Sequence, residues 1–214
     1  MYLSSIPKSV LEQPYSLSFT AASLRPDLAR VLADHFLSSG DWEVVKRDVL
    51  ATNALQARTP SSGIRLEREF RQRLMTLTPE QLRLLSNGSA DERAAMTWLA
   101  MLKYNAFVFE FVADCLRDKL ESLDTTLRPS DYERFIDSRS TAHPELSGLK
   151  ETSRKKIRAV LRRMLTEAGL LVPGNALGTL QRAIPSPSAL AAIQTDNRSW
   201  LAGFLLSDAE IARL

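Results

Sequence analysis

Residues 153–171 read Ser-Arg-Lys-Lys-Ile-Arg-Ala-Val-Leu-Arg-Arg-Met-Leu-Thr-Glu-Ala-Gly-Leu-Leu, which indicates a long basic helix that leads into a strand. At 100° per residue, its larger apolar side chains fall on one face, which we expect to pack in the core. The opposite face carries the side chains of Lys155, Ala159, Arg162 and Thr166. Gly169 is a candidate for the left-handed residue that ends the helix. The core face is predicted to hold Ile157, Val160, Leu161, Met164, Leu165 and Ala168.

The segments around this helix predict a winged helix-turn-helix. Two shorter helices are expected before it, at Ser130–Ser138 and Glu145–Leu149. Two strands are expected after it, Leu170–Pro173 and Leu180–Ile184, joined by the turn-forming loop Gly174–Thr179. The order of helix, short helix, long basic helix from about Thr152 to Ala168, and β-ribbon is typical of that motif.

The N-terminal part of the chain has the periodicity of about six helices with short connections. Ser or Thr followed three residues later by Gln or Glu marks several helix starts: Thr78 with Gln81 and Ser89 with Glu92 in this part, and Ser130 with Glu133 and Ser207 with Glu210 farther along the chain. The expected extents are 24–38, 42–56, 63–77, 79–86, 90–103 and 105–122. Short connections favour antiparallel neighbours, so a helical bundle is predicted.

The predicted fold class is therefore mainly α, with an N-terminal helical bundle and a C-terminal winged helix-turn-helix that carries a short β-ribbon. A break in helicity at Leu123–Pro129 places the domain boundary there. The predicted domains are residues 1–125 and residues 126–214. The second includes a helical tail, whose apolar cluster of Trp200, Leu201, Phe204, Leu205 and Leu206 is expected to dock on the body.

The positive charge of the chain is concentrated in the second domain. The formal net charge is +3, yet seven Lys and Arg stand against one Glu between Lys150 and Arg163. A helix fits the major groove of B-DNA, and cationic side chains bind phosphates or guanine edges. The sequence therefore predicts a non-enzymatic subunit that binds double-stranded DNA. Its candidate DNA-binding residues are Lys150, Thr152, Arg154, Lys155, Lys156, Arg158, Ala159, Arg162, Arg163, Asn175 and Arg182.

Within this set the expected roles differ with position along the helix. The N-terminal half of a recognition helix reads bases, so Lys155, Arg158 and Ala159 are assigned to the groove floor. The remaining cations are assigned to phosphate contacts: Lys150, Lys156, Arg162, Arg163 and the wing residue Arg182.

A second basic stretch, from Arg58 to Arg73, surrounds the helix predicted at 63–77 and includes Arg71. The spacing of Glu69 and Arg73 by four residues predicts an ion pair. Arg58, Arg65 and Arg68 are candidates for secondary DNA binding by neutralisation of the phosphate backbone. Glu67 and Glu69 are interleaved with these arginines, however, which favours an ordinary solvated face.

Motifs for catalysis, metals or cofactors are not found in the sequence. There is no glycine-rich phosphate loop, and one cysteine with two distant histidines gives no metal-ligand spacing. Glu110 and Asp114, one helical turn apart, are expected to be exposed or paired with Lys and Arg rather than catalytic. No metal, cofactor or small-molecule substrate is therefore predicted, and Cys115 is expected to be a buried, inert thiol.

The location predicted from the sequence is the cytoplasm. Met1–Val10 lacks the apolar core of a signal peptide. The most apolar stretch, Ala106–Leu116, is interrupted by acidic residues and is far shorter than the roughly 20 residues that span a bilayer. No membrane contact is expected.

The whole sequence resembles the BrxA family of bacterial BREX phage-defence systems. The resemblance rests on the order and spacing of short matches: Tyr15-Ser-Leu-Ser-Phe-Thr20, Asp41-Trp42, Asn53 through Arg58-Thr59, Arg68-Glu69, Arg73-Leu74, Lys103-Tyr104 and Glu167-Ala-Gly-Leu-Leu171. It implies a mainly helical cytoplasmic protein that binds double-stranded DNA. It also implies other BREX proteins as partners, among them a methyltransferase and a phosphatase-like component.

Two other functions remain open from the sequence. The chain is alternatively a protein-interaction adaptor in the same defence complex, with the basic helix on an acidic partner and the cluster Trp200–Leu206 as a docking site. A third hypothesis, RNA binding by the N-terminal bundle, rests on the arginine-rich helix alone.

Overall fold

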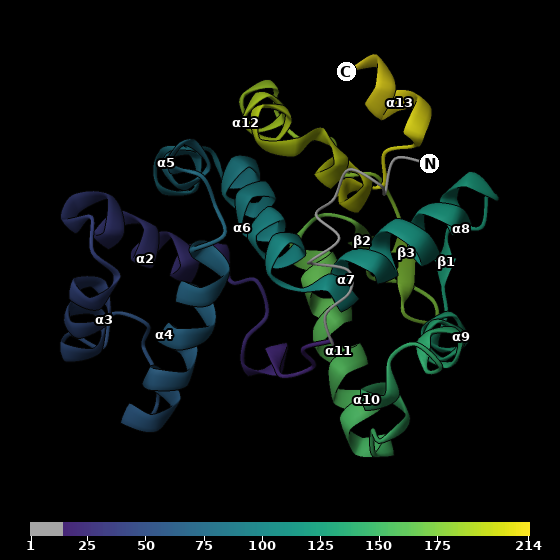
Figure 1. Cartoon of the computed structure of the whole chain (residues 1–214), viewed down its shortest axis with the longest axis horizontal. Helices are drawn as coiled ribbons and strands as arrows, with labels where there is room; N and C mark the ends of the chain where they lie inside the picture. Colours follow the sequence, from purple (N-terminus) through teal and green to yellow (C-terminus); the bar gives the residue numbers. More distant parts are fainter. Residues whose placement is uncertain (1–14) are drawn as a thin grey trace.

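The computed structural model describes residues 15–214 and is mainly helical, with a small antiparallel sheet (Figure 1). Met1–Val10, examined above for a signal peptide, lies outside the described residues. The elements are η2 (Phe19–Ala21), α2 (Pro26–Ser39), α3 (Trp42–Ala51), α4 (Pro60–Leu74), α5 (Pro79–Asn87), α6 (Ala90–Tyr104), α7 (Ala106–Glu110), η3 (Phe111–Leu116), α8 (Arg117–Glu121), β1 (Thr126–Leu127), α9 (Pro129–Arg139), α10 (Pro144–Ser147), α11 (Glu151–Glu167), β2 (Leu171–Val172), β3 (Gly178–Leu180), α12 (Pro187–Asn197), η4 (Arg198–Phe204) and α13 (Asp208–Arg213).

Most of the predicted helix starts are confirmed. Capping boxes, in which the N-cap hydroxyl and the N3 side chain bond each other's backbone amides, begin α5 at Thr78, α6 at Ser89 and α13 at Ser207. Helix α9 differs from the prediction. Its N-cap residue is Arg128, whose backbone amide donates to the Asp131 carboxylate at 2.8 Å, and the predicted pair of Ser130 and Glu133 does not form the cap.

Two predicted helix boundaries were wrong. The helix expected over 42–56 ends at Ala51, because Asn53 and Gln56 adopt positive φ angles of 50° that an α-helix cannot contain. Helix α4 begins at Pro60, three residues before the expected start, because Thr59 and Ser62 form a capping box ahead of it. The predicted connection 59–63 is thus mostly the first turn of α4.

The sheet has three short strands in the order β1-β3-β2, all antiparallel. Leu171 pairs with Leu180, and Thr126 pairs with Thr179. The prediction of the second ribbon strand at Leu180–Ile184 was therefore wrong: that strand is Gly178–Leu180 and uses the end of the predicted loop. Strand β1 was not predicted, because a two-residue strand leaves no periodic pattern.

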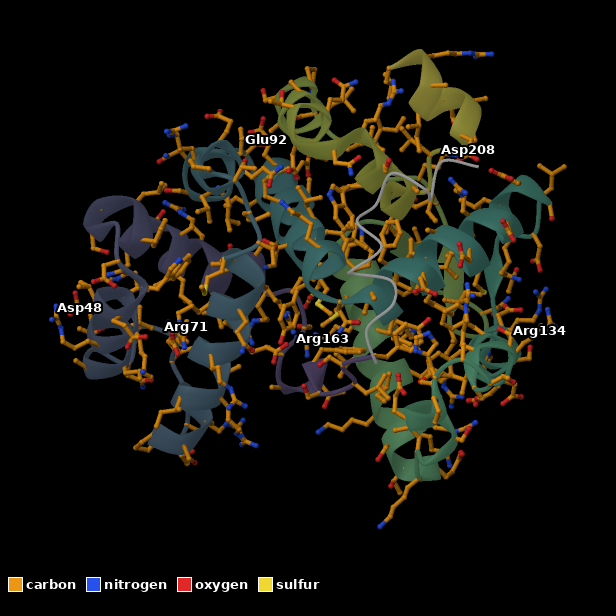
Figure 2. All side chains as sticks on the ribbon, viewed as in Figure 1. Asp48, Arg71, Glu92, Arg134, Arg163 and Asp208 are labelled. Carbon is orange, nitrogen blue, oxygen red and sulfur yellow. The ribbon has the colours of Figure 1, made fainter. Side chains whose placement is uncertain are left out.

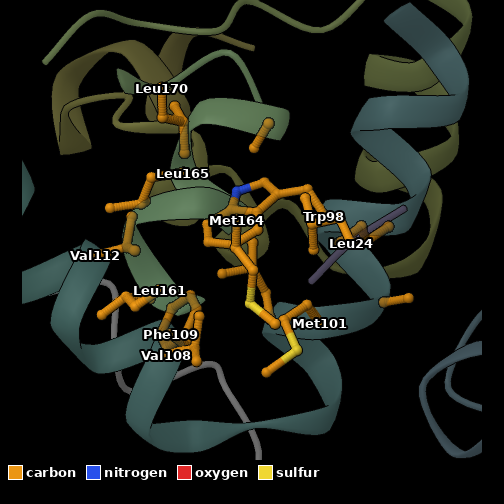
Figure 3. Packing of buried hydrophobic residues seen from close by; sticks show 14 of the residues in the cluster. Leu24, Trp98, Met101, Val108, Phe109, Val112, Leu161, Met164, Leu165 and Leu170 are labelled. Atoms are coloured by element: carbon orange, nitrogen blue, oxygen red, sulfur yellow. The ribbon is translucent and has the colours of Figure 1, made fainter. Parts of the chain in front are cut away.

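One cluster of buried apolar side chains extends from Tyr15 to Ile211. Figure 3 shows its centre, where Trp98 of α6 and Phe109 of α7 surround Met164 of α11. The core therefore crosses residue 125, where the sequence predicts a domain boundary. The division into two domains stays a prediction.

The C-terminal tail docks on this core, as predicted. Its apolar residues from Trp200 to Leu206 are all buried. The Trp98 indole donates a hydrogen bond to the Gly203 carbonyl at 2.8 Å, and Phe109 meets Trp200 edge to face with ring centroids 5.2 Å apart. A buried indole N–H needs such an acceptor, so the tail also satisfies α6.

A buried arginine holds the segment before α2 in place. Arg73 is 1% exposed, and its guanidinium donates to the carbonyls of Ser23 at 2.9 Å, Ala22 at 3.0 Å and Phe19 at 3.2 Å. Glu69 lies one turn away, with its carboxylate 2.7 Å from the same guanidinium. The predicted pair Glu69–Arg73 is confirmed, but it is a buried pair that fastens backbone rather than a surface pair.

The last residue of α11 holds the same segment from the other side. The Glu167 carboxylate accepts hydrogen bonds from the Ser23 hydroxyl at 2.8 Å, the Leu24 amide at 2.7 Å and the Arg25 amide at 3.3 Å. Carbonyls of residues 19–23 thus bind α4, and amides of residues 24–25 bind α11. This segment fixes α4 relative to α11.

We expect Arg73→Met to destabilise the chain strongly, because it leaves the Glu69 charge and three carbonyls without their donor. Breaking one side of a buried pair costs about 3–5 kcal/mol. Urea unfolding measures the loss as a lower midpoint. The control is Arg83→Met on α5, where the arginine is 59% exposed and pairs with Glu80, and little change is expected there. A wild-type midpoint for Arg73→Met would contradict this role.

Candidate nucleic-acid interface

Helix α11 presents one apolar face to the core and one basic face to solvent. The core face predicted from the periodicity is confirmed: Ile157, Leu161, Met164 and Leu165 are buried. Gly169 follows the helix with a φ of +72°, the left-handed conformation expected of it. On the opposite face Lys155 and Ala159 are exposed as predicted, whereas Arg162 and Thr166 are half-buried. The other exposed side chains of α11 are those of Glu151, Thr152, Lys156 and Arg163.

Two of the predicted α11 cations are engaged by α9. The Arg158 guanidinium lies 2.7 Å from the Glu133 carboxylate and 5.9 Å from the centre of the Tyr132 ring. Arg154 lies 3.5 Å from the other Glu133 oxygen and 3.8 Å from Asp137. Glu133 therefore positions α11 against α9, and Arg158 is turned toward α9 rather than along the exposed face. This role of Glu133 is not predicted by the sequence, because its partners lie 21 and 25 residues away.

The other cations of α11 face solvent. Lys150 and Lys156 are exposed and form no ion pair with any residue from 15 to 214. Lys155 is 64% exposed and lies 3.4 Å from the equally exposed Glu151, a pair that solvent weakens. Arg163 is 65% exposed and lies between α4 and α11 in the view of Figure 2, with its guanidinium 3.2 Å from the Glu167 carboxylate one turn along the helix. The exposed face is therefore basic along most of its length.

The loop between β2 and β3 lies next to this face. Residues 172–176 are exposed, Asn175 among them. The Arg162 guanidinium donates to the Leu177 carbonyl at 2.6 Å and so fastens the loop to α11. Arg182 lies two residues beyond β3 and forms an ion pair with Glu210 of α13 at 2.6 Å. The structure thus fastens the loop that carries Asn175 to α11 through Arg162, and holds Arg182 against the tail.

The arginines of the second basic stretch divide into two groups. Arg71 and Arg73 bind Glu67 and Glu69, and both glutamates are buried, Glu67 being only 1% exposed. The candidates Arg58, Arg65 and Arg68 are exposed and form no ion pair with a described residue. The sequence interpretation of Glu67 and Glu69 as charges on a solvated face was wrong, because neither glutamate reaches the surface.

The carboxylates of Glu110 and Asp114 bind structural partners, as expected of them. Both pair with Arg139 of α9, and the Tyr15 hydroxyl donates to Glu110 at 2.7 Å. The Tyr15 ring stacks on His143 with centroids 3.6 Å apart. Burial raises the pKa of the Asp114 carboxyl. These residues together fasten the start of the described chain to α9 and α10.

The structure adds two observations on metals and membranes, both limited to residues 15–214. These residues contain no group of three or more His, Cys, Asp and Glu side chains placed to hold a metal ion. They also contain no helix with the length and hydropathy that a membrane crossing requires.

A cleft of about 640 Å³ lies between η3, α8 and α9, and Cys115 forms part of its wall. Charged side chains form most of the rest, among them Asp118, Lys119, Asp131 and Arg134. The thiol is only half-buried, less than the sequence led us to expect. Burial nevertheless raises its pKa to about 11, so the thiol stays protonated at neutral pH.

We expect Cys115 to react slowly with a disulfide reagent near pH 8. A raised pKa leaves thiolate present above the pKa and scarce below it. An ordinary thiol has a pKa of about 8.5, so the folded chain should react on the order of a hundredfold more slowly than the chain unfolded in urea. Absorbance of the released thiolate measures both rates. Equal rates would contradict the burial of this thiol.

Comparisons with known proteins agree on one family. A family model described as BrxA matches residues 13–197. A BREX protein BrxA of Escherichia coli O9:H4 (strain HS) is 28% identical over 141 residues, which cover 66% of this chain and 66% of that protein. A BREX protein BrxA of Paramagnetospirillum magneticum is 21% identical over 75% of this chain and 80% of that protein. A BREX protein BrxA of Bacillus cereus is 23% identical over 59% of this chain and 64% of that protein.

The matched regions thus span between 64% and 80% of each relative's length. The fold also has a counterpart among solved structures, the crystal structure of an uncharacterized protein from Magnetospirillum magneticum. The two superpose with a TM-score of 0.76 over 90% of this chain and 98% of that chain, at 18% identity, which shows likeness of fold alone. Because the family model covers most of the sequence, this chain belongs to the BrxA family.

Proposed function

We propose that this chain is a non-enzymatic, double-stranded-DNA-binding subunit of a BREX phage-defence system. The observation that carries the proposal is the exposed basic face of α11, which lies beside an exposed loop. The matched relatives are named BREX proteins, which supports the assignment to that system. Other BREX proteins, including a methyltransferase and a phosphatase-like component, are proposed as its partners within the cell.

A winged helix-turn-helix is the arrangement that we propose for α9, α10, α11 and the sheet. Two points support it. The long basic helix is followed by β2, the loop of residues 173–177 and β3, in the order that a wing has. Strand β1, which precedes α9, closes the ribbon by pairing with β3. Helix α11 then takes the place of the recognition helix.

The contacts that we propose for α11 follow from exposure. Lys155 and Ala159 lie on the exposed face and are assigned to the groove floor, where a small side chain permits close approach. Phosphate contacts are assigned to Lys150, Lys156 and Arg163. Thr152 and Asn175 are exposed beside them.

The engaged arginines take a lesser part in this proposal. Arg154 and Arg158 hold α9, Arg162 holds the loop, and Arg182 holds α13. Each of these guanidinium groups has to break a contact within the chain before the same atoms can bind DNA.

The apolar cluster that the adaptor hypothesis takes as its docking site is not on the surface. The cluster Trp200–Leu206 is buried against α6 and α7 and is not available as a surface. No specific feature of the described residues favours that function over DNA binding.

We expect the purified chain to bind duplex DNA, with log K falling linearly as log salt concentration rises, because each phosphate contact releases counterions. Lys155→Ala with Lys156→Ala should lower the slope by roughly 1, because Lys156 is the phosphate contact of the two, and weaken binding about tenfold or more at 0.1 M salt. Fluorescence anisotropy with several unrelated sequences measures affinity and base preference together.

The matched control removes two positive charges elsewhere. Arg134 of α9, labelled far from α4 in Figure 2, and Arg213 of α13 are both exposed. Arg134→Ala with Arg213→Ala should leave the slope unchanged. The proposal fails if wild-type protein binds no duplex at low salt, or if both double variants bind as the wild type does.

We also expect Glu133→Gln to increase the affinity for DNA and to lower the stability of the fold. The change removes a negative charge beside α11 and releases Arg158, so DNA should bind more tightly. The half-exposed pair contributes about 1 kcal/mol, so the thermal midpoint should fall by a few degrees. Unchanged affinity with a lower midpoint would indicate that Arg158 stays away from DNA even when free.

A further inference from the structure

The exposed arginines Arg58, Arg65 and Arg68 form a second basic surface, which we call the α4 patch. Helix α4 exposes no carboxylate, because its two glutamates are buried on Arg71 and Arg73. The surface of α4 is therefore more basic than its sequence, in which positive and negative charges alternate. A surface of unpaired guanidinium groups fits a polyanion.

The chain between the α4 patch and α11 also favours a polyanion. Residues 16–25 read Ser-Leu-Ser-Phe-Thr-Ala-Ala-Ser-Leu-Arg and contain no acidic side chain. Arg25 at their end is exposed and forms no ion pair with a described residue. A phosphate backbone that passes from α11 to α4 along this segment meets no carboxylate of the segment itself.

The geometry brings α4 and α11 within reach of one duplex. The short helix η2 packs against both, and in Figure 1 it lies between the lower halves of the two helices. Two successive packing distances of 8–10 Å separate the two helix axes by at most about 16–20 Å. That spacing corresponds to at most about six base pairs at 3.4 Å each.

The spacing is fixed rather than adjustable. Arg73 of α4 binds the carbonyls of the segment, and Glu167 of α11 binds its amides, so both helices are fastened to the same few residues. Two binding surfaces held rigidly engage one ligand with little further loss of entropy, provided that their spacing matches.

We propose that the α4 patch is a second phosphate-contacting surface for the same DNA duplex, reached within about half a helical turn of the contacts of α11. This inference rests on the proposed function of α11 and extends it: the chain grips a longer stretch of backbone than a winged helix alone. The α4 patch adds affinity and salt dependence without base preference, because phosphate contacts carry no sequence information.

The test compares Arg65→Ala with Arg68→Ala, Lys155→Ala with Lys156→Ala, and the control Arg134→Ala with Arg213→Ala. Each double variant is titrated with a duplex of about 4 base pairs closed by a hairpin loop, which is shorter than the spacing of the two surfaces, and with a duplex of about 20 base pairs. On the longer duplex, the α4 variant should lower the log–log salt slope by roughly 2 and weaken binding about tenfold. On the shorter duplex, which cannot span both surfaces, its effect should be small. Circular dichroism confirms folding of each variant.

The outcomes separate this inference from the proposed function. A wild-type slope for the α4 variant on the longer duplex, with a reduced slope for the α11 variant, overturns the inference alone. Absence of duplex binding by the wild type overturns both. Selective loss of single-stranded RNA binding in the α4 variant, with duplex DNA binding intact, also overturns the inference. A loss that depends on duplex length and is absent from the control supports it.

Discussion

The fastening of residues 19–25 between α4 and α11 is the interaction on which the arrangement of the two helices depends. A guanidinium offers five donors in a fixed plane, and Arg73 uses them on three carbonyls and the Glu69 carboxylate. A carboxylate only accepts, and Glu167 supplies the complementary group for the amides that follow. The segment would otherwise leave buried polar groups without partners, which costs free energy at each group.

This fastening also shapes the surface, because the same ion pairs that stabilise the interior remove negative charge from the exterior. Glu67 and Glu69 are buried with Arg71 and Arg73, so the arginines that remain exposed on α4 are not neutralised by their neighbours. On α11 the opposite holds at Arg158, which Glu133 neutralises. Net charge along a helix is thus a poor guide to its surface potential until burial is known.

The proposed DNA-binding site therefore includes fewer cations of α11 than the composition of that helix indicates. It also includes a second surface, the α4 patch. Arginines near α9 and the loop serve mainly to position α11 and the ribbon, while lysines and Arg163 face solvent. Family membership agrees with a mainly helical fold, and the superposed crystal structure shares that fold over nearly its whole length. The DNA-binding function proposed for the exposed face of α11 is supported by the positive charge of that face and by its helical shape.

The sequence by itself determined the features that depend on contacts within about four residues. The core face of α11, the caps at Thr78 and Ser89, and the left-handed Gly169 all follow from helical periodicity and from local hydrogen bonds. The tail cluster was predicted too, because so many large apolar side chains in one short segment need burial.

Only the tertiary structure established which groups meet across long separations of sequence. Strand β1 forms because Thr126 pairs with Thr179, which is distant in the sequence. Two residues are too few to show the alternating pattern of a strand. Whether an arginine binds a carbonyl, binds a glutamate or faces solvent depends on which element packs against it. Arg73 donates to the Ser23 carbonyl, and Arg158 pairs with Glu133. Long-range partners compete for each charged group, and their positions are set by packing of the whole core rather than by neighbours in the chain.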